Sequence, residues 1–377
     1  MVSEKIRSIT SVLLAIGILA LTVMFLLFPK REFSENENRY LKTLPELTWE
    51  HIVDGSYMED LNAYLCDHFP FRDFFMGGKS RAEILSGRQE INQVFIAKDG
   101  YLIDAYQVPE HTEDTISILR EFAGSVESAG VDLRLMLVPT SVYVYQEKLP
   151  DYAMTPDQME TARAIYEGTG ISRIDVSEAL MAHTEDEQPL YYHTDHHWTT
   201  YGAYIAYQEY CDEMGWEAVP LDEWDAETVT ENFCGTTYSR VNDYSYQGDR
   251  ITIYSHPQDQ LTVTYEDTGE VTDTLYNLAY LEQKDMYSLF LDNLHPIVTI
   301  SNDHAVTDRE LVLIKDSYAN SFVPFLAHHY SVIYVLDTRY YKSGPSTFLK
   351  EHPSATDVLI LYNMFTMDTD AGIRGIF

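Results

Sequence analysis

Short apolar runs alternate with helical segments over much of the chain, and this order limits the folds open to it. The apolar runs lie at residues 131–138, 171–176, 311–314, 332–336 and 358–361. Helices are predicted at residues 113–128, 156–167 and 200–214, and after the run that ends at residue 314. Strands that are apolar throughout are buried on both faces, and their alternation with helices is typical of parallel sheets. The sequence therefore predicts an α/β fold with a mainly parallel sheet covered by helices on both faces.

Residues 217–290 interrupt this alternation. They are acidic and rich in threonine and tyrosine, and residues 251–254 and 261–264 alternate polar with apolar side chains. Alternation with a period of two is typical of strands with one buried face. We therefore predict an antiparallel β-rich insertion in the main domain rather than a separate domain.

Residues 9–28 form a nearly uncharged stretch that is long enough to cross a bilayer as a helix. No small-x-small cleavage pattern follows it, which favours an uncleaved anchor over a removed signal peptide. We predict a cytoplasmic tail and transmembrane anchor at residues 1–31, a lead-in segment at 32–105 and a catalytic domain at 106–377. A single-pass protein of the cell membrane with an extracytoplasmic main domain is expected. A cytoplasmic domain on a tethered helix is the alternative.

The net charge of −35 over 377 residues argues against two classes of partner. Such a surface repels nucleic acid and anionic membrane surfaces, so no nucleic-acid partner is expected. The three cysteines, Cys66, Cys211 and Cys234, fit no metal-binding spacing, and the sequence leaves their pairing open. No cofactor is expected.

Ser317 follows one of the buried apolar runs and precedes a predicted helix. This position lies at the carboxyl edge of a parallel sheet, where α/β folds place their ligand sites. It also lies at a helix N-terminus, whose free N–H groups favour developing negative charge. Ser317 is thus a candidate nucleophile, and the competing interpretation is that it only caps the helix.

A second polar cluster, His193, Asp195, His196 and His197, lies about 120 residues earlier. A hydroxyl, an imidazole and a carboxylate are the groups of a serine-nucleophile site, so His197 is a candidate general base and Asp195 its orienting carboxylate. Two alternatives are a zinc site and a hydrogen-bonded structural loop. No distant Cys or His pattern completes a zinc site, and no metal site is predicted.

The oxyanion of an acyl-transfer intermediate needs hydrogen-bond donors. The backbone N–H of Ser317 or Tyr318 is one candidate, and side-chain amides are others. The candidate amides are Asn293, Asn320 and Asn363. His196 and Trp198 are further candidates for substrate contact, although packing is the alternative role for Trp198.

Several segments, in the same order, resemble the DHHW protein family. These are Asp195-His196-His197-Trp198, Glu37-Asn38-Arg39, Asp67-His68-Phe69-Pro70-Phe71-Arg72, Phe233-Cys234-Gly235-Thr236 and Lys315-Asp316-Ser317-Tyr318-Ala319-Asn320-Ser321. The same segments are similar to the SGNH hydrolase-like domains of the alginate O-acetyltransferases AlgJ and AlgX. One departure is Lys315, which stands where SGNH enzymes usually have glycine before the Asp-Ser pair.

The resemblance implies an SGNH-like three-layer αβα sandwich and serine-dependent acyl transfer. It assigns Ser317 as nucleophile and matches Asp195, His197 and Trp198 to an Asp-x-His-Trp pattern. It further implies a multi-pass membrane O-acyltransferase as acyl donor and an exported or cell-surface polysaccharide as acceptor. The expected function is a membrane-anchored O-acyltransferase that transfers an acetyl group. A carbohydrate esterase and a non-catalytic glycan-binding or scaffold protein are the alternatives.

Overall fold

The computed structural model describes residues 2–369 and 371–376. The chain forms two compact units, and each is described by itself. Unit 1 comprises Met1–Arg88 with Asn242–Ser245, and unit 2 comprises Gln89–Val241 with Tyr246–Phe377. Residues 89–105, expected in the lead-in segment, therefore lie in unit 2.

An eight-stranded sheet forms the centre of unit 2, in the order β11-β10-β12-β14-β13-β15-β6-β7. Strands β14, β13, β15, β6 and β7 run parallel to one another, while β12, β10 and β11 are antiparallel additions at one side. The strand bounds are β6 (Asp132–Val138), β7 (Ser172–Ile174), β10 (Leu261–Tyr265), β11 (Glu270–Thr272), β12 (Ile297–Asn302), β13 (Glu310–Lys315), β14 (Val332–Leu336) and β15 (Asp357–Asn363). The predicted mainly parallel sheet is confirmed.

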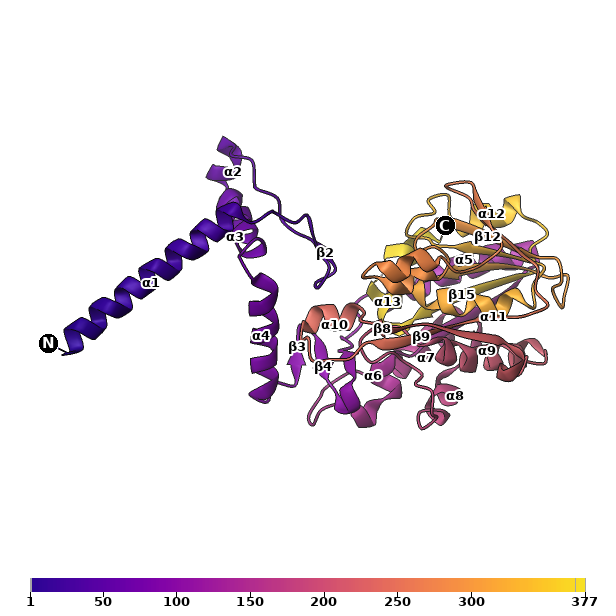
Figure 1. The fold of residues 1–377 in the computed structure, drawn as a ribbon. Helices are drawn as coiled ribbons and strands as arrows, with labels where there is room; N and C mark the ends of the chain where they lie inside the picture. The colour runs from indigo at the N-terminus through magenta and orange to yellow at the C-terminus, as the bar shows by residue number, and fades with distance from the viewer. Residues whose placement is uncertain (1, 370, 377) are drawn as a thin grey trace. The chain divides into compact units, whose positions relative to one another are not determined.

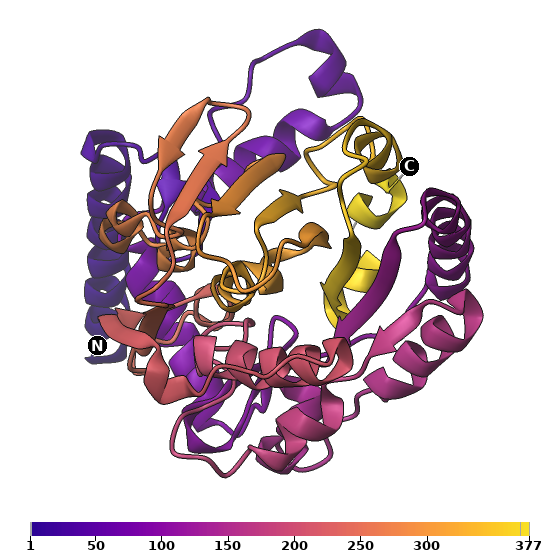
Figure 2. The same ribbon diagram turned by 90° about the vertical axis from the view of Figure 1, so that its right-hand side faces the viewer.

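Helices cover both faces of this sheet (Figures 1 and 2). One layer holds α5 (Thr112–Ala129), α7 (Gln158–Thr169), α12 (Pro345–Glu351) and α13 (Met364–Thr369). The other holds α9 (Thr200–Met214) and α11 (Val323–Ala327), with α6 (Ser141–Val144) and α8 (Ser177–Ala182) beside them. The resulting three layers bury strand β13 so completely that Leu311, Val312, Leu313 and Ile314 expose no surface. This explains why its sequence is apolar throughout rather than alternating.

The β-rich segment is divided between two sheets. Strands β10 and β11 extend the main sheet, while β8 (Asp225–Phe233) and β9 (Asp249–Ser255) form a separate two-stranded antiparallel sheet. A third small sheet contains β3 (Glu90–Ile91), β4 (Val94–Ile96) and β5 (Leu102–Asp104). Helix α10 (Thr236–Val241) and the 3-10 helices η1 (Lys98–Gly100), η2 (Gln146–Lys148), η3 (Leu221–Glu223), η4 (Leu278–Glu282), η5 (Met286–Leu289), η6 (Ser317–Ser321) and η7 (Ala371–Gly375) complete unit 2.

Unit 1 begins with a long apolar helix, α1 (Val2–Leu27). Its segment Ile6–Leu27 has a mean hydropathy of 2.6, is 0% buried, and is long and apolar enough to span a membrane. The unit continues with β1 (Phe33–Ser34), β2 (Arg39–Tyr40), α2 (Trp49–Val53), α3 (Ser56–Asp67) and α4 (Arg72–Leu85).

Ion pairs join two of the sequence blocks that carry the family resemblance, Glu37-Asn38-Arg39 and the block from Asp67 to Arg72. The Arg39 guanidinium donates to both carboxylate oxygens of Asp67 and to Glu37. Glu37 also pairs with Arg72. Asp67 accepts a further hydrogen bond from the backbone N–H of Lys42 at 2.9 Å. Because a guanidinium binds a carboxylate through two parallel hydrogen bonds, this network fixes the orientation of the strand that carries Arg39 relative to helix α3.

The three cysteines are free thiols. Cys66 is exposed, Cys211 is buried and Cys234 is intermediate. The pairing that the sequence left open therefore does not occur in the described structure, and no disulfide takes part in holding the sheet or its loops.

Candidate active site

Ser317 lies where strand β13 leaves the sheet. Asp316 continues the ladder, since its backbone N–H donates to the carbonyl oxygen of Leu361 at 3.1 Å. The Asp316 carboxylate then caps helix η6 by accepting from the N–H of Tyr318 at 2.9 Å. Asp316 rather than Ser317 is thus the N-cap, and Ser317 is the first residue of the helix. Its side chain is partly exposed, so a substrate can reach the hydroxyl.

The loop that carries the histidines is held by local hydrogen bonds. Asp249 accepts from the backbone N–H groups of His193 and Thr194 at 2.9 and 2.8 Å. The ring of His193 stacks on Tyr101, with ring centroids 3.9 Å apart. His193 therefore stabilises the loop, and the candidate catalytic residues are those that follow it in the sequence.

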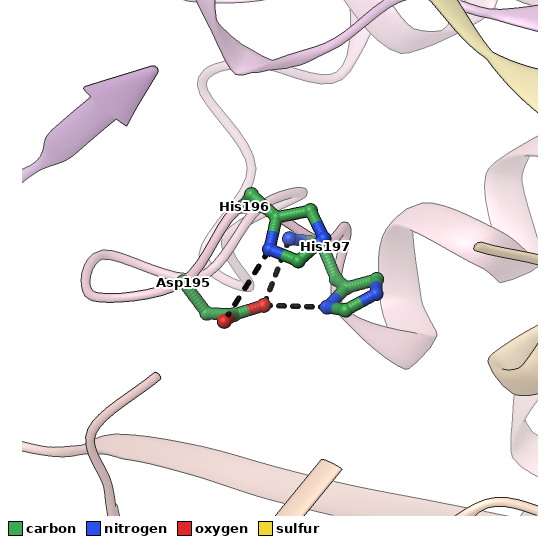
Figure 3. A group of neighbouring side chains, drawn as sticks. All are labelled: Asp195, His196 and His197. Atoms are coloured by element: carbon green, nitrogen blue, oxygen red, sulfur yellow. Dashed lines mark hydrogen bonds and ion pairs between the residues drawn. The ribbon is translucent and has the colours of Figure 1, made fainter. Parts of the chain in front are cut away.

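Asp195 and His197 form a tight pair within this loop (Figure 3). One carboxylate oxygen of Asp195 accepts from the backbone N–H of His197 at 3.0 Å, which closes a short turn, and lies 2.6 Å from Nδ1 of the same residue. The other ring nitrogen of His197, Nε2, lies 2.7 Å from the hydroxyl oxygen of Ser317. Hydroxyl, imidazole and carboxylate are thus in hydrogen-bond contact in the order that nucleophile activation requires.

The second carboxylate oxygen of Asp195 is held by the first residue of helix α10. Thr236 donates to it from its backbone N–H at 2.8 Å and from its hydroxyl at 3.0 Å. Gly235 lies so close that a Cβ atom on it would approach the carboxylate oxygen to 2.2 Å. A residue without a side chain is therefore required beside Asp195.

Replacing Gly235 with alanine should displace the Asp195 carboxylate. We expect a loss of about 1–3 kcal/mol in the free energy of unfolding from overpacking, together with a loss of any activity that depends on Asp195. Gly124→Ala is the matched control, because that glycine lies in helix α5 with open space around its Cβ position. Thermal unfolding of both variants measures the difference, and equal stability of the two would contradict the packing described here.

Burial and neighbouring charges set the protonation of the triad. Burial opposes the ionisation of Asp195, but the charges of His196 and His197 outweigh it and hold the pKa of this carboxyl well below its usual value. Burial and the charge of His196 lower the pKa of His197 to about 4, although Asp195 opposes them. His197 is therefore neutral at neutral pH and able to accept a proton at Nε2.

The lowered pKa of His197 predicts activity that persists under mildly acidic conditions. At pH 5 an imidazole with a pKa of 6.5 is about 3% neutral, whereas one with a pKa of 4 is about 90% neutral. Replacing His196 with glutamine removes a charge that lowers the His197 pKa, so the acid limb of kcat/KM should move to higher pH. His352→Gln is the control. An acid limb that stays in place in His196→Gln would contradict the assigned coupling.

Tyr287, in helix η5, covers the imidazole of His197. The two rings stack with centroids 3.7 Å apart and planes 10° from parallel. The Tyr287 hydroxyl lies 3.1 Å from both the carbonyl oxygen of Ser317 and the hydroxyl of Ser321. This side chain therefore links the base to the backbone of the nucleophile and keeps water from one face of the imidazole.

With the fold and this geometry described, comparison with known proteins identifies the family. Residues 95–290 match the family described as "SGNH hydrolase-like domain, acetyltransferase AlgX". The chain belongs to this family. The resemblance noted in the sequence is confirmed, and family membership supports an acetyltransferase-type function. A comparison with curated proteins finds no significant match.

Two solved structures are similar to this AlgX-family chain. A DHHW family protein from Eubacterium siraeum is 27% identical, with a TM-score of 0.65, and the match covers 76% of this chain and 96% of that one. PatB1 from Bacillus cereus, in a structure with a sulfonyl adduct, is 17% identical, with a TM-score of 0.61, and the match covers 75% of this chain and 98% of that one. The second likeness supports the SGNH-like fold alone.

Two of the predicted contact residues of this AlgX-family site are engaged in its framework. Trp198 is fully buried, and its indole N–H donates to the carbonyl oxygen of Tyr318 at 2.9 Å, so packing is its role here. Nδ1 of His196 lies 2.7 Å from the hydroxyl of Thr236 and 3.6 Å from Asp195. His196 thereby helps to hold the triad carboxylate.

The predicted donors to the oxyanion differ in whether they already have a hydrogen-bond partner. The N–H of Tyr318 is engaged by Asp316, and so is the amide of Asn363, which donates to Asp316 at 2.7 Å from both its backbone and its side chain. Asn293 interacts with the side chain of Tyr280 and, within the described residues, makes no hydrogen bond to the triad. The two donors that remain are the N–H of Ser317, which has no acceptor within its own helix, and the side chain of Asn320.

Asn320 lies one turn after Ser317 in helix η6. It is 4% exposed, and its side-chain oxygen is buried without a hydrogen-bond partner in the described structure. This oxygen is a hydrogen-bond acceptor, so only the Nδ2 group of the same amide could donate to an oxyanion. The ammonium of Lys315, the residue that departs from the usual glycine, lies 3.6 Å from the carboxylate of Asp337.

The triad carboxylate and its two neighbouring imidazoles also meet the first condition for a metal site. Asp195, His196 and His197 offer donor atoms that all lie within 4.8 Å of one another. However, each ring nitrogen of His197 already has a partner, Asp195 on one side and Ser317 on the other. A metal would have to break the contact between His197 Nε2 and the Ser317 hydroxyl, so these contacts argue against metal binding at His197.

Sequence reasoning missed the contributions of Tyr287, Thr236 and Gly235. The last two belong to a segment that carried the family resemblance, which was the available signal for them. Tyr287 lies in a stretch without a motif, and tyrosine is abundant in this chain, with 29 residues. Its stacking on His197 depends on how the segment before β12 folds back over the site, which no local pattern indicates.

Proposed function

We propose that this chain is a membrane-anchored, extracytoplasmic serine O-acyltransferase that moves an acetyl group onto a hydroxyl of a cell-surface or exported polysaccharide. The observation that carries the proposal is the contact of 2.7 Å between His197 Nε2 and the Ser317 hydroxyl, with Asp195 on the far side of the ring at 2.6 Å. Membership of the AlgX-like acetyltransferase family supports acetyl as the group transferred.

The proposed reaction proceeds in two transfers through one serine. His197 takes the proton of the Ser317 hydroxyl as its oxygen attacks the carbonyl carbon of the acetyl donor. Asp195 accepts the hydrogen bond from Nδ1–H and stabilises the imidazolium that forms. The tetrahedral intermediate collapses to an acetyl-serine, and His197 returns the proton to the leaving group. A sugar hydroxyl then loses its proton to His197 and attacks the acetyl-serine, and His197 returns that proton to the Ser317 oxygen as the serine is released.

Stabilisation of the tetrahedral oxyanion is proposed for the Ser317 N–H and the Asn320 amide. The first N–H groups of a helix carry partial positive charge, and Ser317 is the first residue of η6. Preorganised donors of this kind contribute about 3–4 kcal/mol each to transition-state stabilisation.

The anchor and the family suggest how substrates reach the site. Segment Ile6–Leu27 would hold the chain at the membrane, with unit 2 outside the cytoplasm. A multi-pass membrane O-acyltransferase is the proposed acetyl donor, because an acetyl group made in the cytoplasm has to cross the membrane before an extracytoplasmic serine can accept it. Ser317 and His196 are partly exposed, which suits an acceptor as large as a glycan chain.

An acetyl-transfer assay tests the proposal. The full-length chain in detergent is given an activated acetyl ester with and without oligosaccharides, and the acetylated sugar and free acetate are measured. We expect acetylated oligosaccharide to form with the natural chain and not with Ser317→Ala, while Ser301→Ala behaves like the natural chain. Free acetate as the sole product would contradict a transferase and support the esterase alternative. Equal product from the natural chain and Ser317→Ala would contradict both enzymatic functions.

A further inference from the structure

A second cluster of histidine and carboxylate side chains lies in unit 2, outside the triad. It consists of His256, Asp259 and His328, whose donor atoms all lie within 4.8 Å of one another. His256 and Asp259 belong to the turn between strands β9 and β10, which the Asp259 N–H closes by donating to the carbonyl oxygen of His256 at 3.1 Å. His328 comes from the turn between helix α11 and strand β14. Two turns far apart in the sequence thus bring these three side chains together.

The three side chains are largely removed from solvent. The exposed fractions of the side chains are 7% for His256, 6% for Asp259 and 7% for His328. The two imidazole rings lie with centroids 3.8 Å apart. Burying one carboxylate and two imidazoles costs free energy unless these groups are paired or coordinate a metal. The cluster therefore needs an explanation.

The separations of the donor atoms suit a first-row divalent metal. Nδ1 of His328 lies 2.8 Å and Nδ1 of His256 lies 3.8 Å from the same carboxylate oxygen of Asp259. Around a tetrahedral ion with bonds of 2.0–2.1 Å, the ligand atoms are about 3.3 Å apart. The measured separations lie about 0.5 Å on either side of this value, so small side-chain rotations bring all three atoms to bonding distance. A contact of 3.4 Å from the Gln258 N–H to Nδ1 of His256 would lengthen in the process. The hydrogen bond of 2.8 Å between His328 Nδ1 and Asp259 Oδ1 would give way to bonds from both atoms to the ion.

Neighbouring groups orient these side chains as the outer partners of metal ligands do. The Asn302 amide donates to the Asp259 carboxylate at 2.9 Å and to the carbonyl oxygen of Ala327 at 2.9 Å. Trp224 contacts both imidazoles edge-on, with its ring centroid 5.2 Å from that of His256 and 6.0 Å from that of His328. The carboxylate and both rings are therefore held in place before any ion arrives.

A cavity of about 410 Å³ adjoins the cluster and provides an entry path. His256 and Asp259 line it, together with the exposed carboxylates of Asp225, Glu227 and Asp273. A cleft lined by charges of one sign raises the local concentration of ions of the opposite sign. The cavity thus favours the approach of a cation and leaves room for a water molecule or another small oxygen ligand beside the three side chains.

We propose that His256, Asp259 and His328 form a binding site for a divalent first-row transition metal, with Zn²⁺ as the ion whose chemistry fits best. Two imidazoles and one carboxylate are proper zinc ligands, and the cavity supplies the fourth position from solvent. The ion joins the β9–β10 turn to the α11–β14 turn.

The topology of the sheet places this site away from the triad. Strands β13 and β14 run parallel; Ser317 follows the end of β13, whereas His328 precedes the start of β14. The two sites therefore lie at opposite ends of these parallel strands, roughly 20 Å apart along a strand of six residues. The proposal does not depend on the proposed acyl transfer.

Metal titration of the full-length chain in detergent tests the proposal. After removal of metals with a chelator, Zn²⁺ is titrated in competition with a chelating indicator, and Co²⁺ is used to record the visible absorption of a tetrahedral site. We expect one ion per chain with a Kd at or below about 1 μM, and a rise in Tm on binding. The variants His256→Gln and His328→Gln should weaken binding at least about 100-fold and lose the rise in Tm.

The chain offers a matched control for these variants. His183 and Asp186 have the same three-residue spacing and a contact of 2.6 Å, but their side chains are 40% and 36% exposed and no second histidine among the described residues joins them. His183→Gln should therefore bind Zn²⁺ like the natural chain. If a glutamine variant does not fold, Asp259→Asn, which keeps the size of the side chain, replaces it. Absence of stoichiometric binding, binding retained in all three site variants, or binding lost instead in Asp195→Asn would overturn the proposal.

Discussion

Replacing Ser317 with alanine should lower acetyl transfer by about 10⁴-fold or more while leaving the fold intact. The hydroxyl oxygen is the atom that takes the acetyl group in the proposed reaction, and no other hydroxyl lies within hydrogen-bond distance of His197 Nε2 in the described structure. Loss of a nucleophile in a serine site costs up to about 10⁶-fold in kcat. The stability should change by less than about 1.5 kcal/mol, because a single hydrogen bond at a partly exposed position is removed.

The measurement compares the rate of transfer from an activated acetyl ester in the natural chain, Ser317→Ala and Ser301→Ala, with thermal unfolding of each. Ser301 lies in strand β12 of the same sheet and is also partly exposed. A rate in Ser317→Ala within tenfold of the natural chain would mean that another group carries the acetyl. A matching loss in Ser301→Ala would mean that the assay reports stability rather than chemistry.

Replacing Asp195 with asparagine should lower kcat by about 10⁴-fold with little change in KM. Asp195 accepts hydrogen bonds from the His197 ring, from the His197 backbone and from Thr236, which together fix the ring with Nδ1 protonated. An asparagine that turns its NH₂ toward Nδ1 favours the other tautomer, in which Nε2 carries the proton and cannot accept one from Ser317. A loss of this size follows when the orienting carboxylate of a serine triad is replaced in this way.

The Asp195→Asn variant distinguishes a loss of His197 ring orientation from a loss of packing around residue 195. A variant of the same size keeps most contacts, so its unfolding temperature should remain near that of the natural chain. Thr236→Val is a useful companion, because it removes one of the two hydrogen bonds from Thr236 and should cause a smaller loss of kcat. If kcat of Asp195→Asn decreased by less than tenfold, the assigned tautomer would be contradicted.

The parallel sheet was predictable from the sequence because its strands are apolar on both faces. Strand β13 is apolar from Leu311 to Ile314 and is fully buried, so the run itself indicates a central strand. The separation of β8–β9 from β10–β11 was not predictable. Strands β9 and β10 both alternate polar with apolar residues, and which strand pairs with which depends on partners distant in the chain, such as the pairing of β10 with β12.

The sequence was a better guide to the triad residues than to the donors for the oxyanion. Asp195 and His197 are neighbours in the sequence, so their contact follows from a short turn, and only Ser317 had to arrive from a distance. Asn363 and Asn320 are the same residue type in two different roles, one holding Asp316 and the other lacking a partner for its side-chain oxygen. Nothing in the local sequence separates these roles, because they depend on which strand end lies nearby.

The cluster of His256, Asp259 and His328 shows the same limit for side chains far apart in the sequence. His256 and Asp259 have a spacing that fits one turn, but His328 lies about 70 residues later and has no motif of its own. The three meet because the start of β10 and the start of β14 both lie beside the end of β12 in the main sheet. The spacing of the cysteines and of the triad histidines therefore gave no indication of this second group.

Covalent labelling tests the central claim, activation of one serine by a remote histidine, most directly. The full-length chain is treated with a sulfonyl fluoride, and peptides are mapped by mass spectrometry to find the modified residue and the rate of modification. We expect a sulfonyl adduct on Ser317, formed at a rate that falls at least about 100-fold in His197→Gln and is unchanged in His352→Gln. An adduct on another serine, or labelling of Ser317 at the same rate without His197, would contradict the account.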